Sequence, residues 1–266
     1  MIFRMSNLTR AQRAQVLRLL LKGSSIRAVG RSTGLSYNSV SRLFADAAAA
    51  FVELQDEAFR DLKCKRLHLD YVSSSAGLKA KNVRSAKASP FGDIWTWVSI
   101  DADTKLVPSW QIGDCSSKTA IAFVDDLTSR LVRPVQITTD GRKAHLDAIK
   151  RSCKGDLDYE ILTRVYGLGR KRRGLAAQRI GTRAARSARG PRADDRSAGR
   201  RALSKKIDEH ARALALRYMH YNFCCIQKAL CATPAMAAGV TGRLWKIDDL
   251  VQVLENWEAA KLLSSV

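Results

Sequence analysis

The stretch that decides the fold reads Gly92-Asp-Ile-Trp-Thr-Trp-Val-Ser-Ile-Asp101, then Asp103-Thr-Lys-Leu-Val-Pro-Ser-Trp-Gln-Ile112, and later Pro134-Val-Gln-Ile-Thr-Thr-Asp-Gly141. The first two parts predict antiparallel strands, and the third predicts a strand that ends in a carboxylate. In open α/β sheets, chemistry takes place beyond the carboxyl ends of strands. Asp140 is therefore placed for catalysis, and the glycine after it lets the backbone turn sharply.

The segments around this stretch predict the rest of a sheet. Residues 66–72 alternate, with Leu67 and Leu69 on one face and His68 and Asp70 on the other, which indicates a central strand carrying a carboxylate. The strand over 106–112 should lie at an edge, because Pro108 cannot donate a ladder hydrogen bond. The remaining expected elements are a strand over 94–101, a serine-capped helix over 116–131, a parallel strand over 135–139, a short helix over 143–150 and a strand over 159–165.

This order of elements resembles a ribonuclease-H-like fold, a mixed α/β sheet flanked by helices. Such a fold would place Asp70 and Asp140 side by side. Two adjacent carboxylates repel each other unless a cation lies between them, and oxygen ligands favour Mg²⁺ or Mn²⁺. Two such ions can activate water for phosphodiester cleavage. We therefore predict that Asp70 and Asp140 are catalytic metal ligands, whereas Asp101, Asp103 and Asp114 look like turn residues.

The N-terminal 62 residues predict a DNA-binding module. After a helix over 9–21, residues 26–43 fit a helix-turn-helix, with Gly30 where the helices cross, Gly34 in the turn and Ser36 as N-cap. An ordinary helical hairpin is the alternative, and a connecting helix over 45–62 is expected to follow. The side chains expected to contact DNA are Arg27, Arg31, Tyr37, Asn38, Ser41 and Arg42.

The charge of the chain indicates a polyanionic partner. Its 46 Lys and Arg against 25 Asp and Glu give +21 over 266 residues. Double-stranded DNA is the first candidate and a membrane surface the second. No apolar run is long enough to span a membrane, and no signal peptide is recognisable. The six cysteines include no Cys-x-x-Cys pair, which favours free thiols over a zinc site. Free thiols are typical of the cytoplasm, and a DNA-binding protein there would be associated with the nucleoid.

The C-terminal part contains an arginine-rich segment, after which helical sequence patterns return. Residues 168–203 hold eleven arginines and one lysine against two acidic residues, with no helical or strand period. This segment, counted from 167, is either a disordered arginine-rich arm that grips DNA or an out-of-frame or deleted stretch. Residues 204–266 predict helices again, over 205–230, from Thr233-Pro234 to Gly239, and over 247–262. The domain scheme is thus 1–62, 63–166, 167–203 and 204–266.

The quoted residues resemble bacterial insertion-sequence transposases with a DDE-type site. The similar parts are the helix-turn-helix, the Trp-rich strand block, Ile137-Thr-Thr-Asp140-Gly-Arg-Lys-Ala and the tail Met219-His-Tyr-Asn-Phe-Cys. The resemblance covers about residues 7–166 and 204–255. It implies Asp70 and Asp140 as first and second metal-binding carboxylates, Mg²⁺ or Mn²⁺ as cofactor, element ends and target DNA as substrates, and assembly as a homo-oligomer.

The sequence departs from the family pattern in three places, and these departures leave more than one function open. Asp70 is followed by Tyr71, Val72 and Ser73, where the family has an acidic residue and then a tryptophan, and Pro108 stands where it prefers apolar residues. The family's third carboxylate, a glutamate in a Tyr-x-Glu-Arg-x-Asn-like helix, has no counterpart. The chain is therefore expected to be either an active DNA strand-transferring enzyme or an inactive remnant that only binds DNA. A helix-turn-helix regulator is a weaker third hypothesis, since it needs no carboxylate strands.

Overall fold

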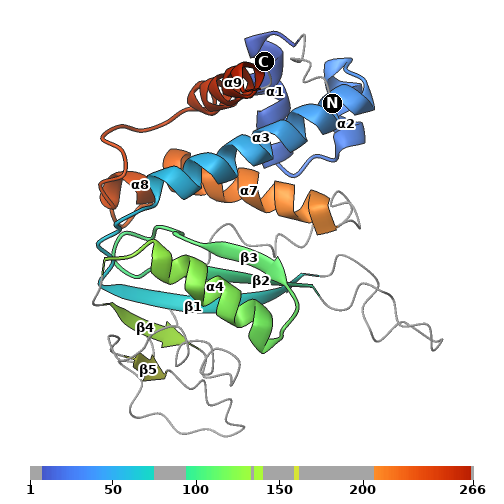
Figure 1. The fold of residues 1–266 in the computed structure, drawn as a ribbon. Helices are drawn as coiled ribbons and strands as arrows, with labels where there is room; N and C mark the ends of the chain where they lie inside the picture. Colours follow the sequence, from blue (N-terminus) through green and yellow to red (C-terminus); the bar gives the residue numbers. More distant parts are fainter. Residues whose placement is uncertain (1–7, 75–93, 133–134, 140–158, 162–206, 265–266) are drawn as a thin grey trace, which may run out of the picture. The chain divides into compact units, whose positions relative to one another are not determined.

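The computed structural model describes residues 8–74, 94–132, 135–139, 159–161 and 207–264 (Figure 1). Asp140, the predicted helix over 143–150 and the arginine-rich segment lie outside the described residues. The chain divides into two compact units. A helical unit takes its described helices from both ends of the chain, and a sheet unit takes its described residues from 59 to 161. Each unit is considered by itself below.

The sheet unit is built on a mixed sheet whose described strands follow the order β3-β2-β1-β4-β5. β1 (Arg66–Ser74) pairs antiparallel with β2 (Ile94–Asp101), which pairs antiparallel with β3 (Trp110–Gly113). On its other side β1 pairs parallel with β4 (Gln136–Thr139), and β4 pairs parallel with β5 (Tyr159–Ile161). This is the order expected of a ribonuclease-H-like fold, so the predicted fold class and the central place of β1 are confirmed.

β3 confirms the predicted edge strand but begins later than expected. The sequence predicted a strand from Leu106, whereas the regular ladder starts at Trp110. Pro108 explains the delay, because it has no N–H to donate to β2. The segment before the strand still runs along β2 through irregular hydrogen bonds, in which the Ser99 amide donates to the Ser109 carbonyl (3.1 Å) and the Ser99 hydroxyl to the same carbonyl (3.0 Å).

One face of the sheet is covered by α4 (Ser117–Ser129), which contacts β2 and β3 (Figure 1). The predicted serine cap is confirmed: the Ser116 side chain accepts a hydrogen bond from the Thr119 amide. The predicted buried stripe is also confirmed for Ala120, Phe123, Val124 and Leu127. The Phe123 ring lies 6.1 Å from the fully buried Trp97 ring of β2, so part of the apolar core of the unit lies on this face.

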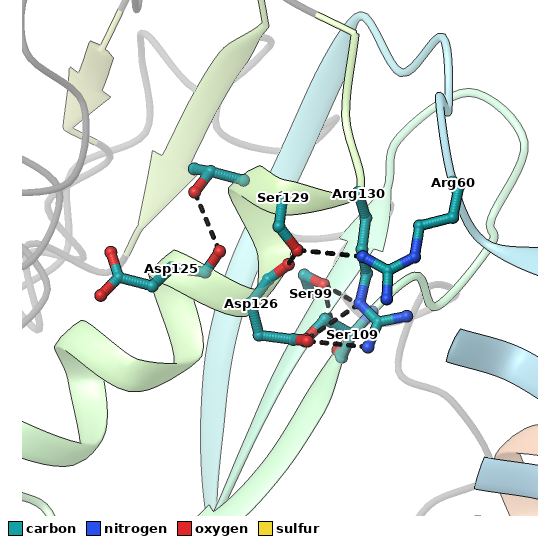
Figure 2. A network of polar contacts seen from close by, with 8 residues as sticks. Arg60, Ser99, Ser109, Asp125, Asp126, Ser129 and Arg130 are labelled. Atoms are coloured by element: carbon teal, nitrogen blue, oxygen red, sulfur yellow. Dashed lines mark hydrogen bonds and ion pairs between the residues drawn. The ribbon is translucent and has the colours of Figure 1, made fainter. Parts of the chain in front are cut away.

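A polar network fixes the C-terminal end of α4 (Figure 2). The Asp126 carboxylate accepts hydrogen bonds from Arg130 Nε (3.0 Å) and Nη2 (2.7 Å) and from the Ser109 hydroxyl (2.5 Å). Arg130 is buried, and a two-point guanidinium–carboxylate pair keeps its charge compensated there. The network joins the helix to the irregular segment before β3, so these charged residues are structural.

Three helices open the helical unit: α1 (Arg10–Leu21), α2 (Ile26–Thr33) and α3 (Tyr37–Ala58). α1 begins with a capping box, in which the Thr9 hydroxyl accepts from the Gln12 amide and the Gln12 side chain accepts from the Thr9 amide. α2 ends at Gly34, whose φ of 71° lies in the left-handed region where glycine is favoured. Two helices joined by a turn at Gly34 thus lie where the sequence predicted a helix-turn-helix.

α3 is longer and simpler than predicted. The sequence separated a recognition helix ending near Leu43 from a connecting helix over 45–62, but the structure has one continuous helix that ends at Ala58. No glycine or proline interrupts residues 37–58. The buried stripe also continues at helical spacing, so nothing in the core favours a break. That stripe comprises Val40, Leu43, Phe44, Ala47, Ala48, Phe51 and Gln55.

The C-terminal segment adds α7 (Ile207–Cys224), α8 (Pro234–Ala237) and α9 (Ile247–Leu263) to the same unit. α7 packs on α3, and α9 packs on α1 and α3. The prediction that the first of these helices extends to Leu230 was wrong. The chain leaves the helix after Cys224 and makes a bridge between Gln227 and Ala232, which leaves Ile226 exposed.

Candidate DNA-binding surface and carboxylate face

β1 presents Asp70 on the face of the sheet opposite α4. Leu67 and Leu69 are buried, and their ladder partners on β2 are Asp101 and Ser99, on the same face as Trp97. Because side chains alternate across a strand, His68 and Asp70 lie on the other face. Asp70 is partly exposed there and pairs with Val98 across the ladder. The predicted strand position of Asp70 is confirmed.

The register between β1 and β4 bears on the second predicted carboxylate. The described pairs are Arg66 with Gln136, Leu67 with Ile137 and His68 with Thr138, an offset of 70 in each case. Asp70 and Asp140 are separated by the same offset in the sequence. Asp140 itself lies outside the described residues and directly follows the last residue of β4.

His68 is the other titratable side chain on this face of β1. Burial lowers the pKa of its imidazole, and the nearby cations Lys105 and Arg66 lower it further. The group is therefore neutral at neutral pH. Sequence reasoning placed His68 on the correct face but assigned it no role, since one histidine among apolar neighbours carries no chemical signal.

Three other aspartates of the sheet unit serve the turns, as predicted. The Asp101 carboxylate is buried and accepts hydrogen bonds from the Thr104 amide (3.1 Å) and hydroxyl (2.5 Å), closing the turn after β2. Asp103 pairs with Arg66. Asp114 accepts from the hydroxyls of Ser116 and Thr119, and these bonds lower the pKa of its carboxyl. None of the three points to catalysis.

Asp70 is the described side chain of this face that suits a divalent cation. Asp70 supplies a carboxylate of the kind that Mg²⁺ and Mn²⁺ prefer, on a partly exposed strand position. Within the described ranges, no group of three or more His, Cys, Asp or Glu side chains could hold a metal ion. Asp70 therefore fits as one ligand of such an ion, and the described residues do not supply a complete site.

The geometry of the helix-turn-helix depends on two glycines and one serine. A Cβ atom on Gly30 would lie 2.9 Å from the Leu35 carbonyl oxygen, so only glycine lets α2 approach the turn this closely. Gly34 supplies the left-handed residue. The Ser36 hydroxyl accepts from the Ser39 amide (3.1 Å) and caps α3 as predicted.

The predicted DNA-contacting residues gather on one part of this module. Arg27 and Arg31, one helical turn apart on α2, line an open hollow of about 460 Å³ together with Tyr37 at the start of α3. Gly30, Gly34 and Leu35 complete its lining. Arginine and tyrosine are residue types that contact phosphate and sugar in nucleic-acid complexes.

The remaining predicted contacts lie on the first two turns of α3. Tyr37 is 47% exposed, Asn38 and Arg42 are exposed, and Ser41 is half-buried. Their neighbours Val40 and Leu43 are fully buried, which fixes the direction in which the exposed set faces. The structure thus brings Arg27, Arg31 and Tyr37 together, and Asn38, Ser41 and Arg42 follow Tyr37 on the first two turns of α3.

Charged residues in the interior of the helical unit escaped sequence reasoning. Arg13 of α1 and Glu258 of α9 are both almost fully buried and form an ion pair at 2.8 Å. Asp46 of α3 lies in the electrostatic field of the same arginine. Arg13 and Glu258 are 245 positions apart, and no local pattern links them. The burial of both charged side chains in the structure is what indicates their role in holding α9 against α1.

The described cysteines and helices add two further findings. Cys64, Cys115, Cys224, Cys225 and Cys231 are free thiols. The Cys225 sulfur lies 3.2 Å from Nδ1 of His220, and burial raises the pKa of the thiol and lowers that of the imidazole, so both are neutral. None of the helices in the described part of the chain is both long and apolar enough to cross a membrane.

Comparison with known proteins gives low similarity. No family model matches the chain, and no curated protein matches it. Among solved structures it is similar to a Mos1 transposase paired-end complex with the left transposon end, with 11% identity, 61% of each chain covered and a TM-score of 0.24. It is also similar to the Mos1 strand transfer complex and a pre-cleavage Mos1 transpososome, at 10% identity with 97% of this chain and 80% of the other covered, and TM-scores of 0.28 and 0.24. The chain spans less than two thirds of the first of these.

Proposed function

We propose that this protein is a DNA transposase of an insertion sequence, which cleaves DNA strands and joins them to target DNA with Mg²⁺ or Mn²⁺ as cofactor. The observation that carries the proposal is the register of β1 and β4. Its offset of 70 equals the separation of Asp70 and Asp140, so the two carboxylates would be ladder neighbours if the register continued. A regulator that only binds DNA has no need for such a pair.

The roles follow from the residues. Asp70 and Asp140 would hold the cation, which when bound supplies Lewis-acid activation of water and stabilisation of the leaving oxygen. Arg27, Arg31, Tyr37, Asn38, Ser41 and Arg42 would bind the element ends. The charge of +21 would attract target DNA, and the protein would work on DNA in the cytoplasm as a homo-oligomer.

The alternative is an inactive remnant that binds DNA without cutting it. The motive is the missing third carboxylate, for which the sequence has no family-like motif and the described residues offer no three-ligand cluster. Loss of one ligand leaves the cation poorly held, so the rate should fall by orders of magnitude.

A strand-cleavage assay decides between the two. Supercoiled DNA would be incubated with Mg²⁺ or Mn²⁺ and the wild-type protein, Asp70→Asn or Asp140→Asn, with Asp103→Asn as a matched control in a surface turn. Cleavage that is lost in the first two variants and kept in the third supports the enzyme. Intact DNA binding without cleavage supports the remnant, and absence of both refutes the proposal.

A further inference from the structure

The two ends of the chain meet in a buried ion pair. Nη1 of Arg13 on α1 lies 2.8 Å from Oε2 of Glu258 on α9, and Nε of Arg13 donates to the Leu8 carbonyl. The side chains are 3% and 1% exposed. Charges this deeply buried persist only when they are paired and hydrogen-bonded. The pair therefore exists only while α9 stays docked on α1.

The same pair also interacts electrostatically with α3. Asp46 is half-buried, and its carboxyl interacts electrostatically with Arg42, Arg13 and Arg212. Arg42, one helical turn before Asp46, belongs to the predicted DNA-contacting surface. Charged side chains of α1, α3, α7 and α9 thus interact electrostatically, and Glu258 is the one that the C-terminal helix contributes.

Exposed contacts also tie α9 to its neighbours. Arg10 of α1 donates to the Asp248 carbonyl (3.1 Å) and faces Glu255 at 3.7 Å, and Lys261 pairs with Glu53 of α3 at 3.2 Å. Such solvent-exposed pairs contribute little stability each. The buried Arg13–Glu258 pair differs from these exposed pairs, because removing one partner leaves the charge of the other uncompensated in the interior.

From these contacts we infer that DNA binding by the N-terminal helices requires α9 to be docked on α1 and α3, and that the Arg13–Glu258 pair holds α9 there. The C-terminal helix would thus control the affinity for DNA. This inference rests on the proposed DNA binding by α2 and α3. It makes the N-terminal helices alone an incomplete module, although they contain every predicted contact residue.

Glu258→Leu in the full-length chain tests the coupling. It strands the buried Arg13 charge and should loosen α9 from α1, whereas Glu255→Leu makes the same change of charge on the same helix at a more exposed site. The double variant Arg13→Met with Glu258→Leu replaces the pair by apolar side chains and should restore docking, because a well-packed apolar pair is often as stable as a buried ion pair.

Two measurements are needed. Amide hydrogen exchange reports whether α9 and α1 loosen while the sheet unit is unchanged. Fluorescence anisotropy with a labelled mixed-sequence duplex at fixed salt reports DNA affinity. We expect Glu258→Leu to speed exchange in both helices and weaken binding by about tenfold or more, with recovery in the double variant and no more than about a twofold change for Glu255→Leu.

The outcomes separate the inference from the proposed function. Faster exchange in α9 with unchanged DNA affinity overturns the coupling and leaves DNA binding standing. Unchanged exchange in Glu258→Leu overturns the role of the ion pair, whatever the chain binds. A wild-type chain without affinity for the duplex overturns both the DNA-binding function and the coupling to it.

Discussion

Gly30→Ala offers a sharp test of the helix-turn-helix geometry. In the open middle of a helix this change should stabilise by about 1 kcal/mol, because alanine is the better helix former. Here the new Cβ would lie 2.9 Å from the Leu35 carbonyl oxygen, which is backbone and cannot rotate away. Overpacking of this kind costs about 1–3 kcal/mol. The sum is a net loss of about 1 kcal/mol in the free energy of unfolding of the helical unit.

Urea denaturation followed by helix circular dichroism measures this loss, with Gly242→Ala as control. Gly242 has open space where its Cβ would be placed, so that variant should stay within about 0.5 kcal/mol of wild type. The hollow lined by Arg27, Arg31 and Tyr37 also includes Gly30, so under the proposed DNA binding Gly30→Ala should weaken binding of a duplex. A Gly30→Ala protein that is more stable than wild type would refute the close approach of α2 to the turn.

Three further predictions address the surface and the sheet unit. Arg42→Ala should weaken DNA binding and reduce the slope of log K against log salt by about 0.9 if Arg42 contacts one phosphate, as measured by salt titration. Ser116→Ala should cost about 0.5–2 kcal/mol in thermal unfolding, because the Thr119 amide loses its cap. The pKa of the Asp114 carboxyl is lowered from its ordinary value of 3.8, so its hydrogen bonds should stabilise the sheet unit at pH values above 3.8. This contribution should be lost as the pH falls through 3.8 and below. Asp114→Asn should therefore make the stability less dependent on pH in the acid range, as measured by denaturation at a series of pH values.

The strands could be predicted because their information is local. Alternation in residues 66–72 assigns Asp70 to one face, and that face is a property of the strand alone. The serine caps at Ser36 and Ser116 are equally local, since each hydroxyl bonds an amide three residues ahead. Where a pattern was local but ambiguous, prediction failed. The alanine-rich run after Leu43 was separated from the recognition helix, although no residue in it breaks a helix.

The buried charges could not be predicted because their partners are distant. An arginine on an amphipathic helix of a basic chain looks like a solvent-exposed or DNA-facing residue, and Arg13 has the same local surroundings as Arg10 or Arg18. Its partner Glu258 arrives from the opposite end of the sequence. Packing in three dimensions, and not propensity, makes one arginine structural and its neighbour exposed.

Because some arginines are buried in ion pairs, only part of the charge of +21 can contribute to binding DNA. Arg13 and Arg130 have buried side chains paired with Glu258 and Asp126, so neither guanidinium is available to a phosphate. Composition therefore overstates the electrostatic footprint of the described helices and sheet. The salt dependence of DNA binding counts released counterions, so its slope should follow exposed cations such as Arg27, Arg31 and Arg42. It should not scale with the total charge of the chain.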